Sequence, residues 1–127
     1  MPTYDKQAEI LQKIVRYCEE IDLFTERFGR TRKAFQEDLV FQRACAMCIM
    51  QIGELSSRLP EEFRAAYDKV PWQRIRSMRN VFVHDYENID LLRTWETIET
   101  RVPELKAYCE SILRDLASDN DDAWGKK

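Results

Sequence analysis

The only histidine of the chain lies in a short segment that also contains an arginine and a tyrosine. Arg79 precedes His84 by five positions, and Tyr86 follows it by two. Histidine is the side-chain type that exchanges a proton near neutral pH, and arginine offers a permanently charged, forked donor that matches phosphate oxygens. These residue types suit chemistry on a phosphodiester. Asn80 adds an amide that could orient the histidine ring or bind a substrate.

Arg79 needs a partner if this segment is helical. A helix that begins near Pro71 would place Ile75, Met78 and Phe82 on one apolar face, because successive residues turn by about 100°. Arg79 would then lie on the shoulder of that face. An unpaired guanidinium is costly to bury, so we expect it to face a carboxylate, a phosphate or a cleft.

Helical geometry also limits how the polar residues can converge. Arg76, Asn80 and His84 are spaced four apart and form one stripe, whereas His84 is rotated by about 140° from Arg79. One straight helix cannot aim both at one atom, so we expect the helix to end near His84 or two chains to meet there. A satisfied histidine and a salt-bridged arginine at a helix end is the simpler interpretation, and spacing alone favours it because this spacing is common by chance.

The order Arg79-Asn80-x-x-x-His84-x-Tyr86 resembles the signature of the HEPN superfamily, and most closely that of HepT toxins encoded beside a minimal nucleotidyltransferase. The similarity covers nearly the whole chain, from Tyr4 to Leu116. It includes three further segments, which are Ile52-Gly53-Glu54 in the central helix, residues 90–98 after the motif, and Val102-Pro103-Glu104-Leu105 at a kink.

The resemblance implies a metal-independent endoribonuclease toxin of a type VII-like toxin–antitoxin system, without a cofactor. His84 would act as general base or acid on the ribose 2′-hydroxyl and the leaving 5′-oxygen, and Arg79 would stabilise the charge of the transition state. Asn80 would support the scissile phosphate or the histidine. Tyr86 would accept AMP from a nucleotidyltransferase antitoxin, which would neutralise the toxin.

Two other classes of function stay open. In the first, a non-catalytic subunit presents a nucleotide or substrate to a partner nucleotidyltransferase, with Arg79 holding a phosphate and Tyr86 stacking. The intact motif argues against such a scaffold. In the second, the chain is a structural helical dimer with an incidental motif. The partners we expect are RNA, the antitoxin and a second copy of the chain, with a larger hetero-oligomer left open.

The composition indicates one helical domain. The chain has 127 residues, 44% of them hydrophobic and 34% charged, with three glycines and four prolines, which argues against an all-β protein. We expect a cytoplasmic protein, because no apolar run could span a bilayer and the first residues lack the apolar core of a signal peptide. The net charge of −3 predicts modest non-specific affinity for nucleic acid, so RNA contacts are expected from a local basic patch that includes Arg74 and Arg76.

Apolar periodicity predicts an all-α, up-and-down four-helix bundle of HEPN-like type with short additional helices, present as a homodimer. The main helices are expected at residues 4–28, 38–59, 71–84 and 90–116, with short pieces at 31–36 and 61–67. Pro103 should bend or split the last helix. Residues 1–117 form the predicted domain, and 118–127 form a polar, disordered tail in which Trp124 could dock onto the body.

The middle of the second long helix, residues 44–50, is apolar nearly all round. A helix of this kind is buried on every side, which predicts contact with a second subunit as well as with the core. Cys45 and Cys48 in it have zinc-like spacing, but the chain lacks a second cysteine pair and its histidine belongs to the motif. We therefore expect these thiols, together with Cys18 and Cys109, to be small core side chains.

Overall fold

The fold is an antiparallel succession of long helices with short helices at the turns, seen in a computed structural model that describes the backbone of residues 2–125 and the side chains of residues 6–118. The long helices are α1 (Pro2–Phe28), α3 (Leu39–Ser57), α5 (Trp72–His84) and α7 (Val102–Gly125). The short ones are α2 (Arg32–Glu37), α4 (Glu61–Ala66) and α6 (Leu91–Glu96). The described residues contain no strand, so the predicted all-α class is confirmed.

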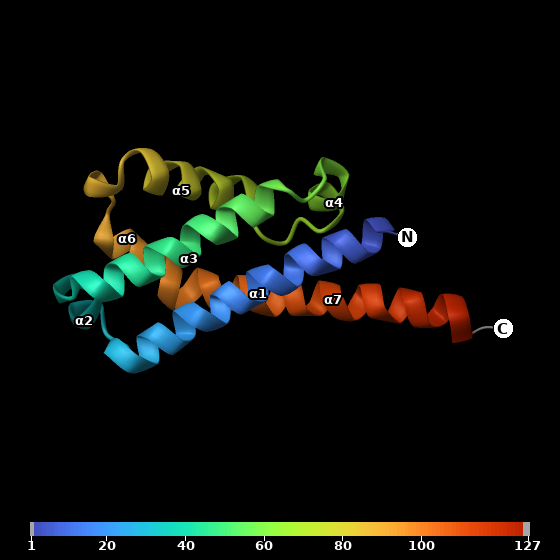
Figure 1. The fold of residues 1–127 in the computed structure, drawn as a ribbon, viewed down its shortest axis with the longest axis horizontal. Helices are drawn as coiled ribbons and strands as arrows, with labels where there is room; N and C mark the ends of the chain where they lie inside the picture. Colours follow the sequence, from blue (N-terminus) through green and yellow to red (C-terminus); the bar gives the residue numbers. More distant parts are fainter. Residues whose placement is uncertain (1, 126–127) are drawn as a thin grey trace.

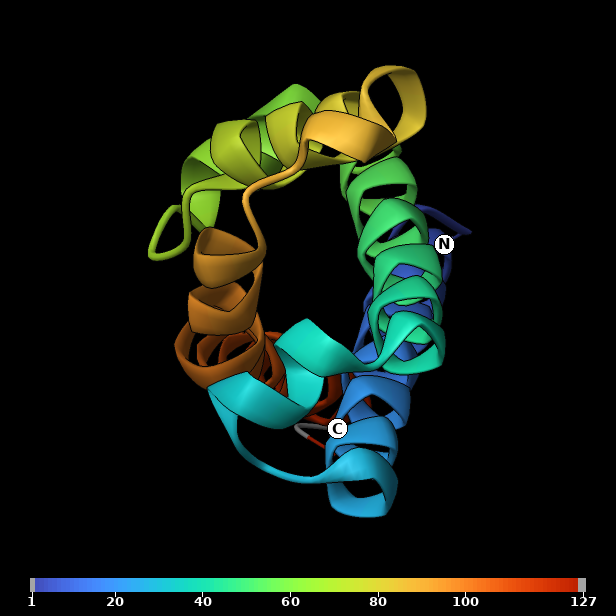
Figure 2. The ribbon, with the colours of Figure 1, turned by 90° about the vertical axis from the view of Figure 1, so that its left-hand side faces the viewer.

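The long helices pack in the order α7, α1, α3, α5 (Figure 1). Seen from the end, α1 and α5 lie on opposite sides of α3 (Figure 2), and α5 rests mainly on α3. The up-and-down order is as predicted. None of the helices in the described part of the chain combines the length and apolar character that crossing a membrane requires.

Helix α1 contributes one amphipathic stripe to the core. Ile14 and Ile21 are fully buried, while the aromatic members of the stripe, such as Phe24 and Phe28, are half-buried at its edge. α1 ends at Phe28 because Gly29 adopts φ 120°, a left-handed conformation that glycine tolerates best.

Aspartates begin two of the helices. Asp38 Oδ1 accepts hydrogen bonds from the N–H groups of Val40 and Phe41, at 2.9 and 3.1 Å. Asp90 Oδ1 accepts from the N–H groups of Leu92 and Arg93, at 3.0 and 3.2 Å, in the same way. Each cap satisfies backbone donors that the first turn of a helix leaves without a partner.

The last predicted helix is interrupted where Pro103 required it. Between α6 and α7 lies a π-helical turn, Thr97–Arg101, in which the Val102 N–H donates to the Thr97 carbonyl. Proline has no N–H, and its ring excludes the carbonyl four residues earlier. The helix therefore widens locally, and its hydrogen bonds reach back five residues instead of four. α7 then runs to Gly125, across most of the expected tail. The Trp124 side chain lies outside the described ones, and disorder of residues 118–127 stays a prediction.

The middle of α3 is only partly enclosed by its own chain. Cys45, Ala46, Cys48 and Ile49 are buried, but Met47 is 55% exposed. A single chain therefore covers only part of the circumference of this segment. A second subunit over the remaining face stays a prediction.

All four cysteines are buried, free thiols, as expected of core side chains. Burial raises the pKa of Cys18 and Cys45 to about 12. It raises the pKa of Cys48 and Cys109 as well, with nearby carboxylates adding to the effect. Among the described residues, no group of three or more histidine, cysteine, aspartate or glutamate side chains is arranged to hold a metal ion.

Candidate active site at the end of α5

The motif helix α5 lies unusually close to α3 at one glycine. A Cβ atom at Gly53 would fall 2.3 Å from Arg79 Cβ and 3.1 Å from the Ile75 carbonyl oxygen, distances too short for ordinary contacts. The rest of the contact is carried by α5 side chains, of which Trp72 and Phe82 are buried. Glycine at this position lets the α5 backbone reach α3, and this explains the small residue between Ile52 and Glu54.

Arg79 is held on two sides. Its Nη2 lies 3.2 Å from Glu54 Oε1 in an ion pair, and its Nη1 donates a 3.0 Å hydrogen bond to Asn80 Oδ1. The Arg79 side chain is 35% exposed, so the guanidinium lies at the surface. The expected partner on the shoulder of α5 is therefore a carboxylate from α3, and part of the guanidinium still faces solvent.

His84 is the last residue of α5, and its side chain is exposed. Asp85 leaves the helix at φ −149° and ψ 43°, and its N–H donates to the Val81 carbonyl at 2.8 Å. The helix thus ends at His84, which is one of the two arrangements expected from the sequence. Within the described part of this single chain, no hydrogen bond joins His84 to Arg79, so the structure does not bring these two together directly.

Tyr86 begins a 3₁₀ turn, Tyr86–Asn88, directly after the motif helix. Its ring packs edge-on against Phe82, with the ring centroids 6.0 Å apart, and Arg43 Cζ lies 5.0 Å from the centroid of the Tyr86 ring. The Tyr86 hydroxyl oxygen is buried and has no hydrogen-bond partner among the described residues. The Tyr86 hydroxyl is therefore enclosed between α3 and α5, whereas the side chain of Arg79, the candidate phosphate-binding residue, is partly exposed to solvent.

Two further arginines of α5 extend the positive charge along the helix. Arg74 is exposed and Arg76 is half-buried, and neither forms an ion pair with another described residue. Arg43 of α3 lies over the Tyr86 ring instead. The contribution of Arg74 and Arg76 to an RNA-binding patch stays a prediction.

Sequence reasoning missed Arg43 and the role of Glu54. Arg43 is 43 positions before Tyr86, and no local pattern links the two. The sequence identified Glu54 only as part of the Ile-Gly-Glu segment that resembles the family, and it did not predict which residue Glu54 contacts. Both residues reach the motif because α3 and α5 cross at Gly53, and such a crossing depends on tertiary packing.

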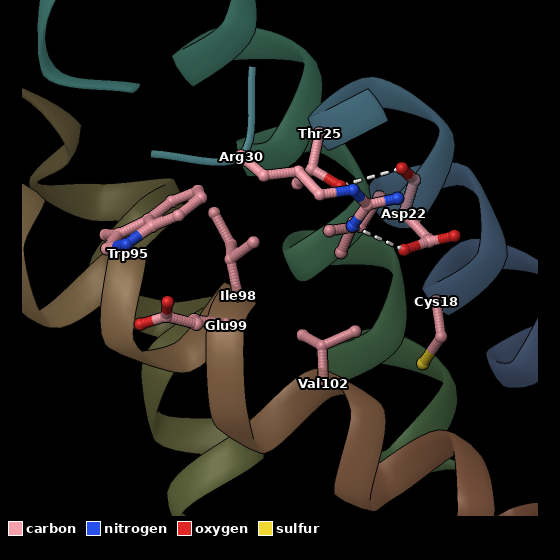
Figure 3. Close-up of a pocket in the computed structure, with 9 residues that line it drawn as sticks. Cys18, Asp22, Thr25, Arg30, Trp95, Ile98, Glu99 and Val102 are labelled. Atoms are coloured by element: carbon pink, nitrogen blue, oxygen red, sulfur yellow. Dashed lines mark hydrogen bonds and ion pairs between the residues drawn. The ribbon is translucent and has the colours of Figure 1, made fainter. Parts of the chain in front are cut away.

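Two hollows of the described surface lie away from the motif. One, of about 310 Å³, opens between α1 and the π-helical turn (Figure 3). Arg30 at its rim is paired with Asp22 at 3.1 Å and with Glu26 at 3.3 Å. Its lining residues are Cys18, Ile21, Asp22, Thr25, Arg30, Trp95, Ile98, Glu99 and Val102, none of them from α5. Its rim has charges of both signs and offers no clear preference for an anion.

The helical bundle, with an ion-paired arginine and an exposed histidine at the end of the same helix, agrees with the HEPN-type fold that the sequence resembles. Residues 14–112 match the family model of ribonuclease HepT-like proteins. Because that match covers most of the chain, the protein belongs to the ribonuclease HepT-like family of enzymes.

Curated relatives agree with this assignment. A protein of Caldanaerobacter subterraneus subsp. tengcongensis named "Putative RNase" is 36% identical over 82% of this chain and 91% of its own length. Another of that name, from Methanocaldococcus jannaschii, is 30% identical over 91% of this chain and 93% of its own. A "Probable ribonuclease HepT" of Thermococcus cleftensis is 26% identical over 84% and 94%. No solved structure matches the chain.

Proposed function

We propose that the protein is a metal-independent endoribonuclease toxin whose active site is formed by Arg79, Asn80 and His84. The observation that carries this proposal is the state of Arg79. Its guanidinium is oriented by Glu54 and Asn80 at 3.2 and 3.0 Å, yet remains partly open to solvent one and a half turns before an exposed histidine. An arginine held in this way suits a phosphate that binds from outside.

In the proposed reaction, His84 removes the proton of a ribose 2′-hydroxyl, and the 2′-oxygen attacks the adjacent phosphorus. The bond from phosphorus to the 5′-oxygen breaks, and that oxygen receives a proton. The products are a 2′,3′-cyclic phosphate and a 5′-hydroxyl, so the phosphodiester itself supplies all the atoms of the products. Arg79 donates to the phosphoryl oxygens as their charge grows, and Asn80 supports the phosphate or the histidine.

A homodimer would complete this site. Arg79 and His84 point in different directions from one helix, and the reaction needs both a base and an acid. A second copy supplies a second His84 for the proton that the leaving oxygen takes up. Exposed apolar side chains on α3, with Val40 63% and Met47 55% exposed, support such pairing, because large apolar residues on a surface often mark an interface.

Neutralisation by AMP transfer to Tyr86 would require a local rearrangement. The acceptor hydroxyl is buried in this structure, under a ring that contacts Phe82 and Arg43. We propose that the nucleotidyltransferase antitoxin binds a form in which the short turn Tyr86–Asn88 has swung away from α3. AMP on Tyr86 would then place phosphate charge beside Arg43 and Arg79, and the added group would block RNA.

The first test is cleavage of a labelled single-stranded RNA by purified protein in the presence of EDTA. Replacement of His84 by alanine should reduce the rate by about 100- to 10,000-fold, the usual contribution of a general acid or base. Arg79→Ala should reduce it by a similar factor. Arg114→Ala, an exposed arginine on α7, is the matched control and should cleave like the wild type.

Each other outcome of this assay is informative. Equal cleavage by the wild type and His84→Ala would indicate a contaminating nuclease. Cleavage that EDTA abolishes would contradict a metal-independent reaction. If no variant cleaves but all bind nucleotide, the non-catalytic binding subunit becomes the better interpretation.

Modification is tested separately with Tyr86→Phe, incubated with the antitoxin and labelled ATP. This variant should still cleave RNA but should gain no label and should escape inhibition. If it is silenced without being labelled, the antitoxin acts by covering the site.

A further inference from the structure

Glu54 of α3 makes an ion pair with the arginine of the proposed active site, although it lies 25 positions before it in the sequence. We propose that Glu54 is a positioning residue, which orients the Arg79 guanidinium for the scissile phosphate. This inference rests on the proposed ribonuclease function and adds a residue to its machinery.

Arg79 is held at two points. Glu54 Oε1 forms an ion pair with Nη2 at 3.2 Å, and Asn80 Oδ1 accepts a hydrogen bond from Nη1 at 3.0 Å, so two different nitrogen atoms of one guanidinium are in contact. Arginine has five N–H donors in a planar fork. One of them donates to Asn80, and the charge of Glu54 holds the Nη2 side, so the two contacts together orient the plane of the fork. A long, flexible side chain is thereby restricted to one orientation before any substrate arrives.

The backbone places Glu54 where this orientation is possible. It follows Gly53, the point at which a Cβ atom would come within 2.3 Å of Arg79 Cβ. Helix α3 is therefore in close contact with α5 at the residue directly before Glu54. A carboxylate here reaches the guanidinium across the helix crossing, while a residue one turn away would be carried to another face of α3 or further along it.

The charge of this cluster still favours an anion. Glu54 also lies near Arg58, with 3.8 Å between Oε2 and Arg58 Nη2, so one carboxylate is shared by two guanidinium groups. The three side chains together have a net charge of +1. Glu54 thus orients Arg79 without cancelling the positive charge that a phosphate would meet. A carboxylate that merely neutralised Arg79 would instead compete with the substrate.

The deciding experiment measures kcat and KM for RNA cleavage by four variants, each with its thermal unfolding curve. Glu54→Ala should lower kcat by about 10- to 100-fold, the size typical of a group that orients a functional ligand, while KM changes little. Glu54→Gln keeps the size of the side chain and an oxygen that can face Nη2 but loses the charge, so it should retain more activity than Glu54→Ala. In an Arg79→Ala background, Glu54→Ala should have no further effect on kcat, because the group it positions is gone.

The matched control is Glu104→Ala. It also removes a carboxylate 3.2 Å from an arginine, Arg101, and changes the net charge by the same amount, but on α7. It should leave kcat at the wild-type value. Fully additive losses in the double variant, or activity of Glu54→Ala equal to or above wild type, would overturn the positioning role. An unchanged rate in Arg79→Ala alone would instead overturn the proposed function, so the two failures are distinguishable.

Discussion

Helix α3 makes two contacts that differ in chemistry. Toward α1 it presents apolar and thiol side chains, with Phe41 stacked on Phe28 at 5.2 Å and the Cys48 thiol donating to Glu20 at 3.6 Å. Toward α5 it presents a glycine and a carboxylate, against which Arg79 packs. The first contact buries apolar side chains away from water. The second holds a charged group at the surface, so stability and activity depend on different faces of one helix.

Among the changes that distinguish the two faces of α3, Phe41→Ala is expected to have the largest effect on stability. Phe41 is fully buried and contacts Phe28, Phe35 and Trp95. Its truncation should lower the free energy of unfolding by about 3–5 kcal/mol, measured by urea titration. Val40→Ala, at the adjacent position but 63% exposed, should change it by less than about 0.5 kcal/mol. A comparable loss for Val40→Ala would show that the assembled protein buries this residue.

The close contact between α3 and α5 is tested by Gly53→Ala. In an open helix this change would stabilise the protein by up to about 1 kcal/mol, because alanine favours helix more than glycine does. Here the new methyl group would meet Arg79 Cβ at 2.3 Å, so we expect a loss of about 1–3 kcal/mol instead. The rate of RNA cleavage should fall by more than the loss of folded protein explains, because α5 must shift and it carries Arg79 and His84. Stabilisation in a thermal melt would contradict the contact.

The apolar face should also be sensitive to alkaline pH. Burial raises the pKa of Cys18 and Cys45 from the ordinary value of 9.0 to about 12. Above pH 9.0 the unfolded chain loses these protons while the folded chain keeps them. Stability should therefore be unaffected by these thiols below that pH and should fall as the pH rises toward 12, by at most about 1.4 kcal/mol per pH unit for each thiol.

Urea titrations at several pH values measure this slope. Cys45→Ala should reduce it, while lysines and tyrosines titrate equally in both proteins. An unchanged slope in the variant would mean that the thiol is accessible in the folded state.

The smallest expected effect concerns two tyrosine hydroxyls. Tyr86→Phe removes a buried hydroxyl that has no partner, so stability should be unchanged or should rise by up to about 1 kcal/mol. Tyr108→Phe removes an acceptor of the Lys69 N–H at 3.3 Å and should cost about 0.5–1.5 kcal/mol. Differential scanning calorimetry compares the pair. Destabilisation by Tyr86→Phe would indicate that a second subunit supplies a partner for its hydroxyl.

Local features of the chain could be predicted because their causes are local. The helix cap at Asp90, the end of α1 before Gly29 and the interruption before Pro103 each depend on the backbone of a few neighbouring residues. The motif was found for the same reason, since Arg79, His84 and Tyr86 lie within eight positions. The middle of α3 marks the limit of such reasoning, because apolar character does not tell which neighbours cover a helix.

The sequence by itself determined the helices, their antiparallel order and the residue types that could act on a phosphodiester, because periodicity, capping and side-chain chemistry are properties of short segments. Only the tertiary structure decided that Glu54 holds Arg79, that Arg43 lies over Tyr86 and that the Tyr86 hydroxyl is enclosed. The physical reason is the crossing of α3 and α5 at Gly53, since the contacts at a crossing depend on the relative rotation and separation of two helices.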